Sequence, residues 1–281
     1  MTGSKLYAHA VAAIKRSLRL HYPGRELLIL PDDVFLVSFP KSGNTWARFL
    51  IANLVHPDVT VTFANIHALI PDPAGTASRI FDRMSGLRII KSHECFEPRY
   101  PRAIYIVRDP RDVVVSQYHY HRKRKLIEDD SPIEKFVARF LAGKTCAHGS
   151  WAENVSTWLV ARRDDPRFLL LRYEEMVSDT PRELAKIASF LGISASPQRL
   201  SEAAARSSAN QMREMEKKQA HLNTLTKGAR QDISFVRAAG SGGWRKELPE
   251  HCVAEMESAW SGVMRELGYE LHQKSLIETG H

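Results

Sequence analysis

Four short segments rich in apolar residues, separated by helical patterns, constrain the fold of this chain more than any other feature. The segments span residues 34–39, 88–91, 103–107 and 168–171. Segments of this length and composition are typical of strands buried on both faces. Apolar residues recur at helical spacing in three further stretches, which are 151–159, 184–191 and 253–267. The alternation predicts an α/β fold with a mainly parallel central sheet flanked by helices.

Length and composition predict one soluble globular domain. The chain has 281 residues, of which 43% are hydrophobic and 26% are charged, as in ordinary globular proteins. No internal repeat or long linker divides it, so we expect a single domain over residues 1–281. Within it we expect a basic N-terminal helix over 1–25, a core that carries the motifs over about 34–245, and a C-terminal helix over about 250–268.

Cysteine content and hydropathy indicate the cellular compartment. Cys95, Cys146 and Cys252 form no CxxC pair, which argues against a disulfide framework and against structural zinc. No apolar stretch is long enough for a transmembrane helix, and no apolar region of a secretory signal follows the basic N-terminal residues. We therefore predict a cytoplasmic protein without a metal site.

The charge balance predicts an anionic partner. The net charge of +8 suits a nucleotide, a nucleic acid, a sulfated or phosphorylated substrate, or a lipid surface. Because the basic residues are dispersed and no nucleic-acid-binding signature is present, we expect no nucleic acid. The basic run over residues 122–125 is predicted to be a solvated face. It could attract an anionic glycan or lipid headgroup, which leaves peripheral membrane contact open.

The loop after the first predicted strand has the composition of an anion site. Pro-Lys-Ser-Gly-Asn-Thr-Trp occupies residues 40–46, directly before a helical run. Free backbone N–H groups and the positive end of the helix dipole meet there, and Lys41 adds a full charge. Trp46 offers an aromatic face that could stack on a nucleotide base. The simpler alternative is an ordinary capped helix that starts at Thr45.

A histidine follows the second predicted strand. Lys91, Ser92 and His93 occupy the strand end, where ligands of parallel sheets bind. His93 is therefore a candidate general base, since histidine exchanges protons near neutral pH. A satisfied surface or core histidine is the alternative. Glu94 is a weaker candidate base, because successive residues at a strand end point apart.

The third predicted strand ends in a second cationic segment. Arg108 stands at the strand end, Pro110 can begin a helix, and Ser116 lies two helical turns further along. Arginine binds phosphate in a bidentate manner. In the alternative interpretation, Asp109 and Asp112 neutralise the arginines in a surface network.

Together these segments resemble the cytosolic-type sulfotransferase family, whose members transfer a sulfuryl group from 3′-phosphoadenosine 5′-phosphosulfate (PAPS). Residues 39–46 resemble the family's loop for the 5′-phosphosulfate, 91–93 resemble the segment that supplies the catalytic base, and 108–116 resemble the 3′-phosphate segment. Residues 172–176 and 235–244 are similar to its YEDM segment and its C-terminal glycine-rich loop. The five motifs occur in the family's order, which makes the match specific.

The resemblance implies a mechanism and a set of site residues. An acceptor hydroxyl, or less favourably an amine, would attack sulfur in line while His93 takes its proton, and 3′,5′-ADP would leave. Lys41 would stabilise charge on the oxygen between sulfur and phosphorus, and Lys91 would add a second cation. No metal is needed. The residues implied to bind PAPS are Lys41, Ser42, Gly43, Asn44, Thr45, Trp46, Arg108, Ser116, Tyr173, Ser207, Arg237, Ala238 and Ala239.

The sequence departs from the family pattern near the nucleotide and leaves the partners open. Ala238 and Ala239 stand where Lys and Gly are usual, and Ala209 replaces a Phe that would stack on adenine. The family's dimer motif is not visible after Trp244, so the oligomeric state stays open. The acceptor could be a small molecule, a glycan or a lipid. Residues 56–84 are predicted to cover it, and residues 211–231 are predicted to form a mobile lid.

Two other functions fit part of the pattern. A P-loop nucleotide kinase-like phosphotransferase needs a Walker A motif and a magnesium-binding carboxylate, but GxxxxGK[ST] is absent. A basic nucleic-acid-binding module needs aromatic residues interleaved with a basic patch. Both stay alternatives at this point.

Overall fold

Four parallel strands form the central sheet, in the order β2-β1-β3-β4. Each strand lies in one of the apolar segments: β1 (Val34–Ser38), β2 (Ile89–Ser92), β3 (Arg102–Val107) and β4 (Phe168–Arg172). Val37 of β1 lies opposite Ser92 of β2 and Tyr105 of β3. The carboxyl ends of these three strands therefore lie side by side at one end of the sheet. The predicted α/β fold is confirmed.

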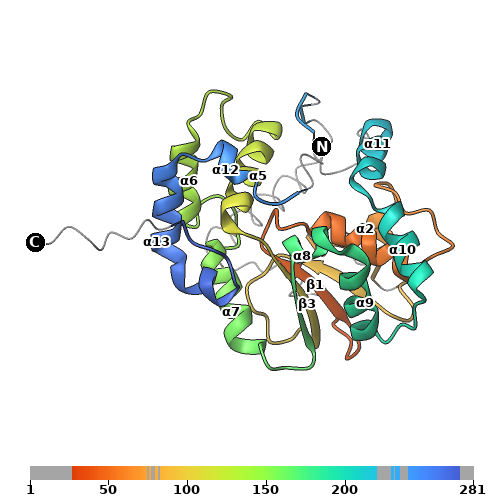
Figure 1. The fold of residues 1–281 in the computed structure, drawn as a ribbon. Coiled ribbons are helices and arrows are strands. Elements are labelled where there is room, and N and C mark those ends of the chain that lie inside the picture. Colours follow the sequence, from red (N-terminus) through yellow and green to blue (C-terminus); the bar gives the residue numbers. More distant parts are fainter. Residues whose placement is uncertain are drawn as a thin grey trace, which may run out of the picture.

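Helices cover both faces of the sheet, in two groups (Figure 1). One group comprises α5 (Pro110–Lys123), α6 (Ile133–Leu141), α7 (Trp151–Arg162), α12 (Trp244–Glu247) and α13 (Glu250–Glu266). The other comprises α2 (Asn44–Val55), α3 (Ile66–Leu69), α8 (Tyr173–Ser178), α9 (Thr180–Leu191), α10 (Pro197–Arg206) and α11 (Ala209–Gln219). The predicted C-terminal helix corresponds to α13.

Side chains of the central strands alternate between two hydrophobic cores. Phe35 and Val37 of β1 pack with the α5–α13 group, whereas Val34 and Leu36 pack with the α2–α11 group. This alternation follows from the pleat of a strand, in which successive side chains point to opposite faces. Both faces are apolar because both are covered by helices, which explains the nearly continuous apolar run of β1.

The two edge strands differ in how they are buried. Leu169 and Leu170 of β4 are only partly buried, so the prediction of full burial is wrong for this strand. Its position at the edge of the sheet is the physical reason. The other edge strand, β2, is buried throughout. A loop covers it, and the backbone N–H of Lys91 donates to the Pro71 carbonyl at 2.8 Å.

The basic run over residues 122–125 is not uniformly solvated. Lys123 is 2% exposed, and its ammonium donates to the carbonyl oxygens of Arg230 and Ile233. It also lies 3.5 Å from the carboxylate of Glu216. The prediction of a solvated face is therefore wrong for Lys123, because this lysine ties α5 to segments later in the chain.

The computed structural model describes residues 27–74, 76, 80–81, 83–219, 229–230, 232–234 and 240–272. The predicted helix over 1–25, most of the predicted lid after residue 219, and Arg237, Ala238 and Ala239 lie outside these ranges. Within them, no helix is both long and apolar enough to cross a membrane.

Candidate active site

The loop between β1 and α2 is built around Gly43. This glycine precedes α2 with φ 98°, in the left-handed region that glycine tolerates best. A Cβ at this position would lie 2.5 Å from Cδ2 of Tyr173, so the loop and the Tyr173 ring are in close contact. No side chain caps the helix here, so the alternative of a helix capped by Thr45 is wrong. The backbone N–H groups in the first turn of α2 have no partner within the helix, so they can donate to a bound anion.

Polar side chains of this loop point in different directions. The Lys41 ammonium lies 4.5 Å from the centre of the Tyr120 ring on α5. Ser42 is fully buried, and its hydroxyl has no hydrogen-bond partner in the described part of the chain. The amide of Asn44 turns back to the strand and donates to the Leu36 carbonyl at 3.2 Å. Thr45 is half-buried in the first turn of α2.

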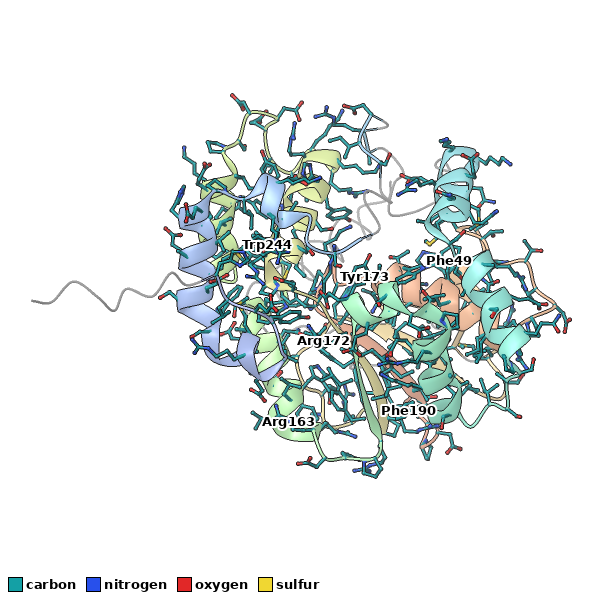
Figure 2. The ribbon with its side chains drawn as sticks, viewed as in Figure 1. Phe49, Arg163, Arg172, Tyr173, Phe190 and Trp244 are labelled. Carbon is teal, nitrogen blue, oxygen red and sulfur yellow. The ribbon has the colours of Figure 1, made fainter. Side chains whose placement is uncertain are left out.

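Arg108 joins this loop to the glycine-rich loop near the C-terminus. Its guanidinium donates to the carbonyl oxygens of Lys41 at 3.4 Å and Gly240 at 3.0 Å. The same group lies 4.2 Å from the centre of the Tyr173 ring, and Figure 2 shows Tyr173 between the two groups of helices. Nε of Arg108 is buried and has no hydrogen-bond partner among the described residues. Lys41 and Arg108 thus lie at the same end of the sheet, as the sequence predicts.

Asp112 holds the glycine-rich loop in place. Its buried carboxylate accepts from the backbone N–H groups of Gly242 at 2.7 Å and Trp244 at 3.1 Å. The nearest approach of this carboxylate to Arg108 is 3.9 Å. The carboxylate therefore fixes the loop on α5, one turn before Ser116, which is half-buried on the same helix.

The predicted neutralisation of the arginines is close for Arg111 and only partial for Arg108. Asp109 lies 2.7 Å from the Arg111 guanidinium, and Glu257 lies 2.5 Å from it on the other side. Arg111 is 2% exposed, so this network is a buried structural one. Arg108 keeps a long ion pair with Asp112, at 3.9 Å. Because the Asp112 oxygens accept mainly from backbone donors, this pair balances the charge of Arg108 only in part.

The residues expected around adenine are connected to one another. The indole N–H of Trp46 donates to the Ser207 carbonyl at 2.9 Å. The Ser207 hydroxyl is fully buried and accepts from the Asn53 amide at 2.9 Å. The ring of Trp46 also meets that of Tyr173 edge to face, with centroids 5.7 Å apart. Ser207 therefore orients Trp46 through its backbone, and its hydroxyl stays inside the core.

His93 is oriented by the strand that leads into the anion loop. Nδ1 of His93 lies 2.7 Å from the backbone oxygen of Ser38, the last residue of β1. Because a carbonyl oxygen only accepts, Nδ1 carries the proton and Nε2 keeps its lone pair. Burial, together with the charge of Lys91 and the neighbouring His148, holds the pKa of His93 well below its usual range. The imidazole is therefore neutral at physiological pH, as a general base requires.

Lys91 is buried and paired with an acidic residue from the covering loop. Its ammonium donates to the carboxylate of Asp72. Burial opposes the charge of Asp72, but the Lys91 ammonium lowers the pKa of the carboxyl to about 2. The charge of Lys91 is thus largely balanced, a feature that the sequence motif alone did not reveal.

His148, in the loop before α7, was not among the site residues predicted from the sequence. Its ring centroid lies 5.7 Å from that of His93, and its Nδ1 lies 3.6 Å from the carboxylate of Glu94. Burial and the charge of Lys91 lower the pKa of His148 to about 4. Nothing in its sequence environment distinguishes this residue from other histidines, and only tertiary folding brings it to His93.

The carboxyl ends of the strands thus bring together an anion loop with Lys41, a second segment with Arg108, and the neutral His93. This combination is typical of an enzyme that transfers a group from an anionic donor. Within the described ranges, no group of three or more His, Cys, Asp or Glu side chains could hold a metal ion.

Comparison with known proteins identifies the family. Residues 31–268 match the sulfotransferase domain. The chain is 27% identical to human sulfotransferase 2A1 over 268 residues, which cover 91% of this chain and 92% of that protein. It is 28% identical to 3-beta-hydroxysteroid sulfotransferase of Cavia porcellus, over 85% of this chain and 86% of the relative.

Solved structures show the same fold. Mouse sulfotransferase SULT7A1 complexed with PAP superimposes with a TM-score of 0.69 and 26% identity, over 85% of this chain and 87% of the other. Retinol dehydratase in complex with androsterone and PAP gives a TM-score of 0.71 at 19% identity, over 93% of this chain and 88% of the other, a likeness of fold alone. The chain therefore belongs to the sulfotransferase family, and both the predicted family and the predicted enzyme class are confirmed.

Proposed function

We propose that this enzyme moves the sulfuryl group of PAPS to an acceptor hydroxyl, or to an amine, and releases 3′,5′-ADP (PAP). The observation that carries the proposal is the bond between His93 and Ser38. It joins the candidate base to the strand that leads into the anion loop, and it aims the lone pair of Nε2 away from that strand. The complex of the mouse relative with PAP supports the choice of donor.

The residues around the loop fit a doubly phosphorylated nucleotide. The buried hydroxyl of Ser42 and Nε of Arg108 both lack protein partners within the described ranges, and buried polar groups of this kind normally have one. The uncapped first turn of α2 adds backbone donors for an anion. We assign the 5′-phosphosulfate to the loop over residues 40–46 and the 3′-phosphate to Arg108 and Ser116.

In the proposed mechanism, PAPS supplies a sulfuryl group whose bond to the bridging phosphate oxygen breaks. The acceptor oxygen forms the new bond to sulfur, and its proton passes to Nε2 of His93. Lys41 would turn from the Tyr120 ring to stabilise charge on the bridging oxygen, and Lys91 would hold Asp72 and the covering loop beside the reacting groups. Positioning and electrostatic stabilisation thus supply most of the catalysis.

Trp46 and Tyr173 are proposed to hold the nucleoside. Trp46 would stack on adenine in the orientation that Ser207 gives it. The ring of Tyr173, which closes the loop at Gly43, would keep Arg108 in place. Arg237, Ala238 and Ala239 stay predictions, because they lie outside the described residues.

A small molecule is the proposed acceptor, since one relative is named as a 3-beta-hydroxysteroid sulfotransferase. The cytoplasmic location and the absence of a nucleic acid partner stay predictions. A radiolabelled-PAPS assay against a panel of alcohols, phenols and amines tests the proposal. We expect label transfer by the wild-type enzyme without added metal. Transfer of phosphate from ATP with magnesium, and none of sulfate from PAPS, would favour the kinase alternative.

A further inference from the structure

The groups around His93 are polar and titratable on the side that faces the covering loop and His148. Lys91 and Asp72 form an ion pair there, and His148 stands 5.7 Å from His93, centroid to centroid. The pKa of His93 is affected by Lys91, Asp72 and His148, so these three residues lie near the His93 side chain. An acceptor that presents its hydroxyl to His93 must therefore meet polar side chains.

Among the residues that the structure describes, Glu94 is the carboxylate in this region that no lysine or arginine balances. Asp72 is paired with Lys91, and Glu97 lies 2.9 Å from the Arg99 guanidinium. Among the described residues, the ion-pair partner of Glu94 is His148, at 3.6 Å. No lysine or arginine of the described ranges lies within ion-pair distance of this carboxylate.

His148 does not compensate the charge of Glu94. Its depressed pKa of about 4 leaves the imidazole neutral at physiological pH. Burial, with Glu97 and Asp72 nearby, raises the pKa of Glu94 to about 7. The side chain of Glu94 is only 15% exposed, so an ionised carboxylate there is poorly solvated. Such a group is stabilised by any cation that a ligand brings to it.

We propose that Glu94 and His148 form a subsite for a cationic substituent, so that the enzyme prefers acceptors in which a protonated amine lies a few bonds from the reacting hydroxyl. This inference rests on the proposed function. The ammonium would bind the Glu94 carboxylate, and His148 would line the path to His93. A purely apolar alcohol would instead desolvate both side chains without giving either a partner.

The preference would set this enzyme apart from the relative that is named for a steroid acceptor. A steroid alcohol carries its hydroxyl on an apolar skeleton, which offers nothing to an uncompensated carboxylate. An amino alcohol or an arylalkylamine phenol offers both groups that the site calls for. The spacing of His93 and His148 lets one small molecule contact both residues.

Two matched phenols test the inference. Tyramine and 4-ethylphenol share a ring, a hydroxyl and a two-carbon chain, and they differ in the ammonium group. We would titrate each by calorimetry into the enzyme saturated with PAP, at pH 8, where Glu94 is ionised. We expect tyramine to bind about tenfold more tightly or better. Glu94→Gln should remove this preference, whereas Glu97→Gln, which alters a carboxylate already paired with Arg99, should keep it.

Equal binding of the two phenols, or a preference that survives Glu94→Gln, would overturn the inference. Label transfer from PAPS to the same phenols is measured in parallel, so the two proposals can fail separately. Tyramine preference without transfer of label to any acceptor of the panel would refute the proposed function and keep the cationic subsite. Transfer to 4-ethylphenol with no binding preference would keep the function and refute the subsite.

Discussion

Nδ1 of His93 lies 2.7 Å from the backbone oxygen of Ser38. This hydrogen bond connects the carboxyl ends of two neighbouring parallel strands, β1 and β2. One strand leads into the anion loop and the other carries the base. The strand pairing and this hydrogen bond therefore fix the position of the base relative to the anion loop.

Replacing His93 with Asn should greatly reduce transfer and leave nucleotide binding intact. The Asn amide can still donate to the Ser38 carbonyl, so the local structure is kept while the basic nitrogen is lost. We expect transfer to fall by roughly 10²–10⁴-fold and the affinity for PAP to stay within about threefold. Labelled-PAPS turnover and calorimetry measure the two effects. Turnover like that of the wild type would remove His93 from the role of base.

The acid limb of the pH profile should lie below the ordinary histidine range. Burial and the nearby Lys91 lower the pKa of His93, and a base is active only when it is unprotonated. As the pH falls from 8 to 6.5, kcat for a neutral acceptor should therefore stay level, and it should decline only at lower pH. A profile recorded with 4-ethylphenol checks this. A half-maximal point at or above pH 6.5 would show that His93 is not held neutral.

Gly43→Ala should disrupt the anion loop. The added Cβ would meet the Tyr173 ring at 2.5 Å, at a φ of 98°. We expect a loss of about 1–3 kcal/mol in the free energy of unfolding and a marked loss of PAP affinity. Gly192→Ala is the matched control, since Gly192 has φ 72° and open space around it. Its backbone strain should lower stability while PAP binding persists, and equal PAP affinity in both variants would contradict the assignment of the loop.

Asp112→Asn should weaken PAP binding through the glycine-rich loop. The amide can accept only one of the two bonds that Gly242 and Trp244 donate to the carboxylate. Unsatisfied buried donors of this kind cost about 1–3 kcal/mol, so we expect roughly a tenfold loss of affinity. Asp165→Asn, which alters a carboxylate paired with Arg162 and Arg167 in the loop before β4, should leave PAP binding unchanged. Unaltered affinity in Asp112→Asn would show that the loop does not need this anchor.

Much of the fold could be predicted from the sequence, because the central strands are buried on both faces and turn residues separate one apolar segment from the next. The apolar runs of β1 and β3 carry this signal directly. The exposure of β4 could not be predicted, since its composition matches a central strand and only the pairing order puts it at the edge.

The site was predictable where its residues follow a strand end. Lys41, His93 and Arg108 each follow the carboxyl end of a parallel strand, so they lie at the same end of the sheet. His148 and Asp72 come from loops without any periodic pattern, and they reach His93 only through tertiary packing. The inward turn of the Asn44 amide was also hidden, because its partners are strand carbonyl and hydroxyl groups.

Binding of the nucleotide with and without its 3′-phosphate tests the central claim most directly. Arg108 bridges the two loops that would surround a doubly phosphorylated adenosine. Calorimetry should show that the wild type binds 3′,5′-ADP at least about tenfold more tightly than 5′-AMP, and that Arg108→Gln removes most of this difference. Equal affinity of the wild type for the two nucleotides would contradict the account.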